Sequence, residues 1–163
     1  MGRKIVDLPE HDEEAALASV AGYCMAIDMT ARNLQEEAKK KGLPWTAAKG
    51  FDTFLPISSF IAKEKIRDPH DVELYLNVNG KEIQRDETGL MLFRIPRLLS
   101  EISRVMKLEE GDMVLTGTPK GVGPVEVGDV MSAGLKAGGK EIEEGRIEIG
   151  VQEKGGLFEF EET

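Results

Sequence analysis

Residues 72–86, VELYLNVNGKEIQRD, carry the clearest local structural signal in this sequence. Apolar side chains alternate with polar or aromatic ones along the first half of the stretch: Leu74, Leu76 and Val78 against Glu73, Tyr75 and Asn77. A period of two is typical of a strand with one buried face. Asn79-Gly80 follows, and both residues tolerate the positive φ angles of a tight turn. The stretch therefore predicts a β-hairpin, from which the rest of the fold can be worked out.

Two longer helices are predicted, one on each side of this hairpin. Residues 95–107 place apolar side chains at helical spacing, and Pro96 suits a first helical turn. Residues 31–41 predict the other helix, with Thr30 as its N-cap and Gly42 as the residue that ends it.

The remaining segments predict one short helix and several strands. Residues 10–20 begin with acidic side chains, which favour a helix start. Residues 22–29, GYCMAIDM, form an apolar run of strand length and predict a buried strand. Residues 109–117, 126–135 and 145–154 also show strand patterns, and Gly-Asp opens the first two of them. These elements predict an α+β fold that is rich in β-structure.

The composition limits the classes of partner. The chain has 163 residues, 40% of them apolar and 31% charged, and a net charge of −9, so we expect a single domain over residues 1–163. The acidic balance, without a basic stripe, disfavours nucleic acid and membrane surfaces as partners. No apolar run reaches the roughly 18 residues that a membrane-spanning helix needs. The single cysteine excludes an internal disulfide and suits a reducing compartment.

Residues 115–125, LTGTPKGVGPV, could form a phosphate cradle, a plain turn or the wall of another kind of site. The Gly-Lys-Ser/Thr of a phosphate-binding loop is missing, so the first interpretation is disfavoured.

The sequence also offers no convincing set of residues for nucleophilic catalysis. Cys24 lies in an apolar run and is expected to be an inert core thiol, while His11 and His70 are expected at the surface. A zinc site with Cys and His ligands is likewise unsupported.

Asp28 is the unusual residue of the chain, because it is a charged residue within an apolar run. A buried carboxylate is costly without a partner, so such a group is usually paired or bound to metal. The structural alternatives are a pair with Arg32, four residues further on, or a cap on the following helix. Lys49 lies among small and apolar residues and, taken alone, is most simply a solvated lysine.

Two blocks together carry a resemblance to a known family. These are GYCMAIDMTARNLQEEAKKKGLPWTAAKGFDTFLPIS at residues 22–58 and LEEGDMVLTGTPKGVGPVEVGDV at residues 108–130. Their order and spacing resemble the fumarylacetoacetate hydrolase family, in particular its acylpyruvase and oxaloacetate decarboxylase branch. The resemblance implies a fumarylacetoacetase-type mixed β-roll with a few flanking helices. It also implies a homodimer that binds Mg²⁺ or Mn²⁺ and acts on a small-molecule 2-oxo acid by breaking a C–C bond next to a carbonyl.

The resemblance also implies roles for individual residues. Asp28 matches the aspartate metal ligand of the family, and Lys49 matches the lysine that stabilises the substrate carboxylate or enolate. Arg32 and Gln35 match substrate-binding positions, and Thr118 matches a threonine that contacts substrate. On this basis residues 115–125 are expected to form the wall of a metal–enolate site, with a plain turn as the alternative.

The resemblance leaves some of the family's residues unmatched. Family members carry a Glu-x-Glu pair of metal ligands upstream of the segment that matches MGRKI, and a water-activating His/Glu pair further upstream. We therefore expect an N-terminally truncated form of the domain. Three interpretations stay open: part of a longer enzyme, a catalytically inactive relative that serves as a dimerisation or binding module, or an enzyme with replacement ligands. Glu10 and Asp12 have the spacing of a replacement pair, although acids are common at helix starts. The expected location is the cytoplasm or the mitochondrial matrix.

Overall fold

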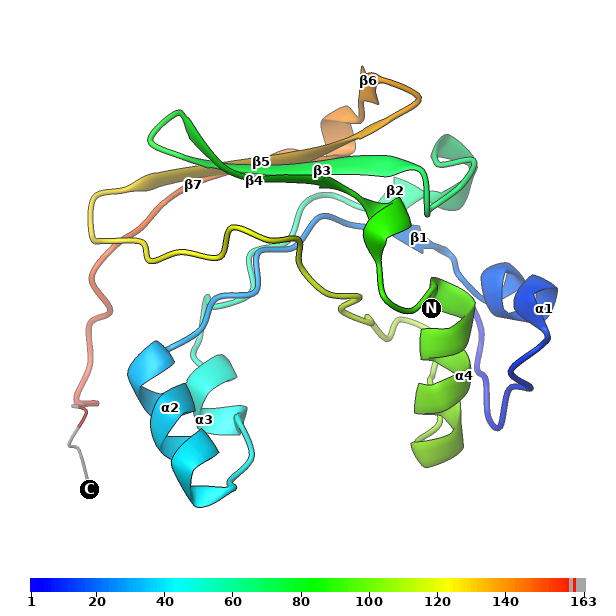
Figure 1. Cartoon of the computed structure of the whole chain (residues 1–163), viewed down its shortest axis with the longest axis horizontal. Helices are drawn as coiled ribbons and strands as arrows, with labels where there is room; N and C mark the ends of the chain where they lie inside the picture. The colour runs from blue at the N-terminus through cyan, green and yellow to red at the C-terminus, as the bar shows by residue number, and fades with distance from the viewer. Residues whose placement is uncertain (159, 161–163) are drawn as a thin grey trace.

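The computed structural model describes residues 1–158 and 160, and an antiparallel sheet organises it (Figure 1). The hairpin is formed by β3 (Val72–Val78) and β4 (Lys81–Glu87). Next to β3 lies β5 (Val130–Ala137), which pairs with both β6 (Lys140–Glu141) and β7 (Ile147–Gly150). The sheet order is β4-β3-β5-β6, and all of these pairings are antiparallel.

The predicted hairpin turn is confirmed in its geometry. Asn79 and Gly80 have φ angles of 51° and 75°, and Val78 pairs with Lys81 across the turn. Only residues that tolerate a left-handed backbone fit both turn positions. The Asn79 side chain adds a second function, because its Oδ1 accepts a hydrogen bond of 2.9 Å from the Val130 amide at the start of β5. The turn thus fixes the hairpin to the neighbouring strand.

The alternation of side chains along β3 is also confirmed. On the outer face Glu73 accepts a hydrogen bond of 2.9 Å from Lys136, and it also pairs with Arg85. The Tyr75 hydroxyl donates to Glu141 at 2.7 Å, and burial together with this carboxylate raises the pKa of Tyr75 to about 12. The outer face is therefore held together by polar contacts, and the apolar face is turned toward the rest of the chain.

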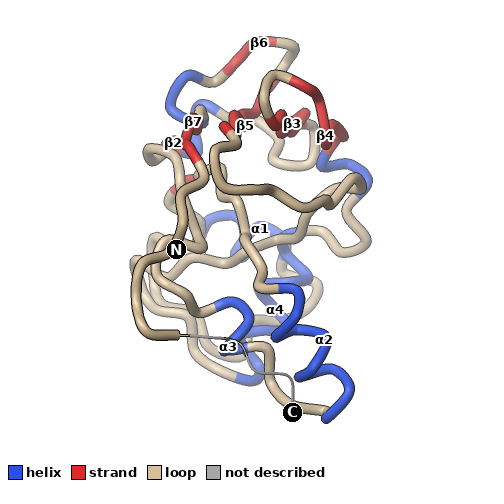
Figure 2. The backbone as a smooth tube through the Cα atoms, turned by 90° about the vertical axis from the view of Figure 1, so that its left-hand side faces the viewer, coloured by secondary structure: helices blue, strands red, loops and turns tan. Residues whose placement is uncertain are grey.

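The helices lie on one side of this sheet in both views of the molecule (Figures 1 and 2). They form two groups: α1 packs with α4, and α2 packs with α3. A short pair of strands, β1 with β2, lies between the sheet and the helices. The bounds of these elements are α1 Glu13–Ala18, β1 Gly22–Tyr23, α2 Arg32–Lys41, α3 Thr46–Lys49, β2 Ile61–Ala62 and α4 Ile95–Val105, with 3₁₀ turns at Lys63–Lys65, Thr88–Leu90 and Glu143–Gly145.

Separate apolar clusters hold these layers together. Ala16 of α1 and Leu99 of α4 pack in one cluster with the N-terminal segment. Met131 and Ile147 on the inner face of the sheet pack in another with Ile27. Because Ile27 comes from the segment that leads to α2, this second cluster attaches the α2–α3 group to the sheet. The sheet-rich α+β class predicted from the sequence is confirmed.

The predicted end of helix 31–41 is confirmed, and its predicted N-cap is wrong. Gly42 ends α2 in the left-handed conformation with a φ of 63°, as predicted. Thr30 as the N-cap was wrong: Ala31 occupies that position, without a side-chain cap, and its amide instead donates to the Ala48 carbonyl at 2.9 Å. The N-terminus of α2 is thus positioned by contact with α3, an element that the sequence pattern did not predict.

Two predicted strands are largely absent. Of residues 22–29 only Gly22–Tyr23 form a strand, and the rest is extended chain bonded to the irregular segment around Pro56. Residues 109–117 form no strand at all, and the chain makes only an isolated bridge from Leu108 to Ile5. Residues 22–29 run antiparallel to residues 54–62, but only part of the regular ladder forms between them. Residues 109–117 meet no strand partner within the described chain.

Candidate active site

The first feature of the site is an ion pair between Asp28 and Lys49. Lys49 Nζ lies 2.7 Å from Asp28 Oδ2, and the side chains are 31% and 45% exposed. Asp28 is carried by extended chain in which successive residues face opposite sides, so Ile27 is buried while Asp28 reaches solvent. In the described chain the carboxylate is paired with Lys49, and the alternatives of a pair with Arg32 or a cap on α2 are wrong.

Arg32 and Gln35 form a second pair at the start of α2. Arg32 Nη1 donates to Gln35 Oε1 at 2.8 Å, which is possible because residues three apart lie on one helix face. Gln35 is buried and Arg32 is exposed. The bond from Ala31 to Ala48 joins the residue before Arg32 to the residue before Lys49. The backbones of Arg32 and Lys49 therefore lie next to this bond, which ties the start of α2 to α3.

Thr118 is positioned by a residue that the sequence did not reveal. Gln84 Nε2 donates to Thr118 Oγ1 at 3.0 Å and to the Pro119 carbonyl at 2.6 Å. Gln84 is only 8% exposed, and in the sheet register it lies opposite Leu76, whose side chain faces the core. The signal available in the sequence was thus an amide at a core-facing strand position, where it needs a hydrogen-bond partner.

The loop 115–125 links β4 to the segment of Asp28. Gly121 has a φ of 99°, and a Cβ there would lie 2.2 Å from the Ile83 carbonyl oxygen, so only glycine permits this approach. At the far end of the loop Val125 packs in the same cluster as Ile27 and Met29, the two neighbours of Asp28. In Figure 1 the loop crosses beneath the sheet, over the extended chain that leads to α2 and returns from α3.

A cavity of about 400 Å³ opens beside Thr118. Its walls combine the hydroxyls of Thr116 and Thr118 with apolar side chains from the segment that joins β4 to α4. This mixture of a few polar groups and a mainly apolar wall is typical of pockets that bind small molecules.

Neither histidine takes part in this arrangement, and one of them corrects a prediction. His11 is exposed, as predicted. His70 is not a surface residue: its side chain is 7% exposed, and Nε2 accepts a hydrogen bond of 3.1 Å from the Ile95 amide. Burial lowers the pKa of His70, Arg94 lowers it further, and Asp68 opposes both effects. His70 therefore caps α4 as a neutral imidazole.

Cys24 is half-buried, and burial raises the pKa of its thiol, which disfavours a nucleophilic role.

The acidic residues show how far the described chain could hold a divalent cation. Asp28 offers a hard oxygen donor, which suits Mg²⁺ or Mn²⁺. The possible replacement ligands are engaged elsewhere, since Glu10 pairs with Arg97 and Asp12 caps α1 through the Ala15 amide. Among the described residues no group of three or more His, Cys, Asp or Glu side chains could hold a metal. Asp28 thus supplies one ligand, and these residues do not form a complete metal site.

Taken together, the fold and the site define an α+β protein in which a lysine–carboxylate pair and an arginine lie beneath an antiparallel sheet. Comparison with known proteins then gives the family. The model of the fumarylacetoacetate (FAA) hydrolase C-terminal family matches residues 1–152, and this chain belongs to that family. The resemblance noted in the sequence is thereby confirmed.

Similar proteins are found among both curated sequences and solved structures. A mitochondrial oxaloacetate tautomerase of Bos taurus is 56% identical over 76% of this chain and 56% of its own length. A mitochondrial oxaloacetate tautomerase of Schizosaccharomyces pombe is 60% identical over 73% of this chain and 54% of its own length. The chain thus spans little more than half the length of these relatives.

The solved structures show that the fold is shared. A yeast protein of the fumarylacetoacetate hydrolase family superposes with a TM-score of 0.93, at 38% identity, over 99% of this chain and 67% of its own. A fumarylpyruvate hydrolase of Pseudomonas aeruginosa, solved in complex with Mn²⁺ and pyruvate, gives a TM-score of 0.85 at 31% identity over 94% of this chain and 62% of its own. The predicted fumarylacetoacetase-type fold is confirmed.

Proposed function

We propose that this chain forms part of an enzyme that acts on small 2-oxo acids through their enolates, with oxaloacetate as the substrate and keto–enol tautomerisation as the reaction. The observation that carries the proposal is the Asp28–Lys49 pair, in a chain that is 56% and 60% identical, over 76% and 73% of its length, to relatives named oxaloacetate tautomerases. In this reaction a proton leaves the carbon next to the carbonyl and another is placed on the carbonyl oxygen, so nothing is added or lost overall.

The charges on the site suit such a substrate. Oxaloacetate is a dianion, and the chain as a whole is strongly acidic, so binding depends on local cations. Arg32 offers a planar guanidinium that can bind one carboxylate through two hydrogen bonds. Its bond to the buried Gln35 holds the guanidinium in place before substrate arrives. The Thr118 hydroxyl, fixed by Gln84, would contact the substrate from the loop side.

Lys49 would stabilise the negative charge that develops on the substrate oxygen as the enolate forms. A cation that is already in position stabilises this charge without reorganisation of solvent. Asp28 would be the ligand that this chain contributes to Mg²⁺ or Mn²⁺, and such an ion, when bound, acts as a Lewis acid toward the enolate oxygen. In this structure the Asp28 carboxylate is paired with Lys49.

A second candidate is cleavage of the C–C bond next to a carbonyl, as in acylpyruvate hydrolysis or oxaloacetate decarboxylation. It is supported by the 49% identical relative from Dictyostelium discoideum that is named an oxaloacetate decarboxylase, and by the similarity to the fumarylpyruvate hydrolase structure. Cleavage would use the same enolate stabilisation by Lys49. A catalytically inactive chain that serves as a binding module is the alternative to both.

One set of assays separates these possibilities. The chain is mixed with freshly dissolved enol-oxaloacetate, and the loss of enol absorbance is followed with Mg²⁺, with Mn²⁺ and with EDTA. Decarboxylation and acetylpyruvate hydrolysis are measured in parallel. Accelerated loss of the enol without pyruvate formation supports tautomerisation, and pyruvate formation supports cleavage. Oxalate binding without turnover would support the inactive module.

We further propose a mitochondrial location and a homodimer. The Bos taurus and Schizosaccharomyces pombe relatives carry the word mitochondrial in their names. Within residues 1–158 and 160, no helix is long and apolar enough to cross a membrane. Large apolar side chains are exposed on the segment that follows β4, with Leu90 at 68%, Leu92 at 93% and Phe93 at 54%. A second copy of the chain would remove this surface from water.

A further inference from the structure

The C-terminal segment makes contacts that the site described above does not explain. After β7 the chain passes down along the α2–α3 group, on the side away from α4 (Figure 1). The match to the family model ends at residue 152, so Lys154 and Phe158 lie beyond the matched part of this chain. Both side chains nevertheless contact Phe51, in the segment that directly follows α3.

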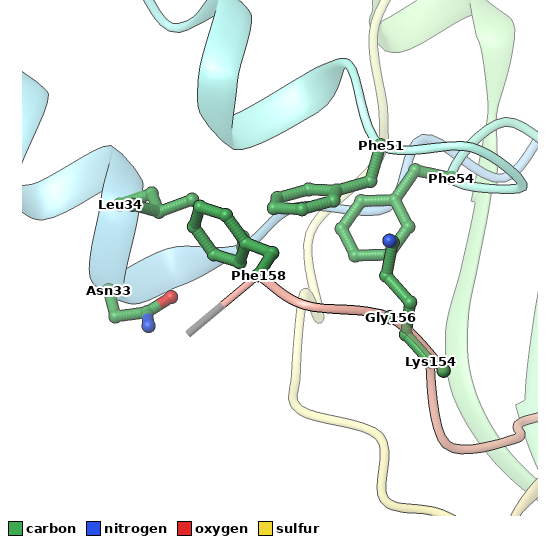
Figure 3. A pocket seen from close by; sticks show the side chains of 9 residues that line it. Asn33, Leu34, Phe51, Phe54, Lys154, Gly156 and Phe158 are labelled. Carbon is green, nitrogen blue, oxygen red and sulfur yellow. The ribbon is translucent and has the colours of Figure 1, made fainter. Parts of the chain in front are cut away.

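The contacts centre on Phe51. The rings of Phe51 and Phe158 meet edge to face, with centroids 5.2 Å apart and planes at 72°. Lys154 Nζ lies 5.5 Å from the centroid of the Phe51 ring, and Phe54 packs against that ring at 5.1 Å. Figure 3 shows the Phe158 ring between Phe51 and Leu34 of α2, at a cavity of about 210 Å³ that these residues line.

The residues that this C-terminal tail, residues 154–158, touches lie close in sequence to residues of the candidate site. Phe51 follows Lys49 by two positions, and Leu34 lies between Arg32 and Gln35 on α2. A four-residue helix such as α3 has almost no stability of its own, so its position depends on packing. The tail adds an aromatic contact on the C-terminal side of α3, beyond the C-cap Gly50, whose amide donates to the Thr46 carbonyl at 2.8 Å.

We propose that the C-terminal tail is a clamp in which Phe158, assisted by Lys154, fixes Phe51 against α2 and thereby positions Lys49 beside Asp28. Phe158 is a positioning residue, since it acts on Lys49 through the Phe51 backbone. The catalytic consequence rests on the proposed function, whereas the physical clamp does not.

The test compares Phe158→Ala with two matched variants in the full chain. Leu157→Ala removes a neighbouring side chain that is fully exposed, at 102%, and Phe158→Tyr keeps the ring. Because Phe158 itself is 57% exposed, its removal opens no core and the variant is expected to fold. Amide hydrogen exchange over residues 46–51 is measured, together with acrylamide quenching of Trp45, the single tryptophan, which precedes α3.

We expect exchange over residues 46–51 to rise about fivefold in Phe158→Ala, as for the loss of one aromatic pair, and to stay unchanged in Leu157→Ala and Phe158→Tyr. Quenching of Trp45 should rise in the same variant alone. Equal exchange in the Phe158→Ala and Leu157→Ala chains would overturn the clamp.

The catalytic consequence is read from kinetics and ligand binding. With oxaloacetate, Phe158→Ala should lower kcat about fivefold with little change in KM, and Phe158→Tyr should restore it. An unchanged kcat with raised exchange would overturn the positioning of Lys49. If the wild-type chain neither turns over oxaloacetate nor binds oxalate with Mn²⁺, the proposed function fails, and the exchange experiment decides the clamp by itself.

Discussion

The ammonium group of Lys49 lies 2.7 Å from the Asp28 carboxylate, although 21 positions separate the two residues in the chain. Asp28 comes from extended chain and Lys49 is the last residue of α3, so their contact depends on how the α2–α3 group is placed. The pair is partly exposed, and such pairs contribute only about 0–1 kcal/mol to stability. Loss of the pair is therefore expected to affect the proposed activity more than the stability of the fold.

Substitution of either member should separate activity from stability. In a form of the protein that turns over substrate, Lys49→Met should lower kcat by roughly 100-fold or more, because enolate charge loses its cation, while metal affinity changes less. Asp28→Ala should abolish metal-dependent turnover. Urea unfolding should show only small losses in both variants. Wild-type turnover in Lys49→Met would contradict the assigned role.

Gln84 should prove important for both the fold and substrate binding. Gln84→Leu removes the amide that donates hydrogen bonds to the Thr118 hydroxyl and the Pro119 carbonyl. Losing both bonds should lower the free energy of unfolding, measured in urea, by about 1–3 kcal/mol. Thr118→Val removes only one of these contacts and should cost less. If Thr118 contacts substrate, both variants should raise KM; a normal KM in both would remove Thr118 from the site.

Gly121 should tolerate no side chain, whereas Gly123 in the same loop should. Gly121 has a positive φ, and a Cβ would lie 2.2 Å from the Ile83 carbonyl oxygen, so Gly121→Ala should destabilise the chain by about 1–3 kcal/mol. Around Gly123 the nearest atom to a Cβ would be 3.9 Å away, and its φ is not positive, which makes Gly123→Ala the control. Thermal unfolding of both variants measures the difference, and equal stability would contradict the close approach.

Stability should fall as the pH drops below about 6.5, the ordinary pKa of histidine. Burial lowers the pKa of His70 in the folded chain, so in that range the unfolded state binds a proton that the folded state does not. The neutral His70 side chain contributes its full stabilisation at a pH above the pKa that it has in the unfolded chain. This contribution is lost as the pH falls toward the lower pKa that His70 has in the folded chain. Urea midpoints between pH 7.5 and 5.5 should show a smaller slope in His70→Gln. His11→Gln, at an exposed position, should keep the wild-type slope.

The chain should self-associate if a second copy covers the apolar segment after β4. Leu92 is 93% exposed and can be changed without disturbing the core, so Leu92→Glu should lower the mass measured by light scattering. Leu43→Glu changes another exposed leucine, between α2 and α3, and should leave the mass unchanged. A wild-type chain that is monomeric at high concentration and melts cooperatively would exclude the homodimer for this chain.

The sequence by itself determined the elements whose cause is local. The β3–β4 hairpin follows from alternation and from Asn79-Gly80, and α4 follows from helical spacing behind Pro96. Gly42 ends α2 for a local steric reason. Asp28 also stood out locally as the single charge in an apolar run, although its side chain is partly exposed in the structure. The order of the two motif blocks was enough to indicate the family. These features depend on neighbours a few residues away, whose spacing can be read directly along the chain.

Only the tertiary structure decided which groups meet. It made Lys49 rather than Arg32 the partner of Asp28, placed Gln84 behind Thr118, and buried His70 as the cap of α4. It also left residues 109–117 without the partner that a strand requires. Each of these outcomes depends on the path by which distant segments return to one another. The chemical type of a side chain determines which kind of partner it requires. The packing of the whole chain determines which residue provides that partner.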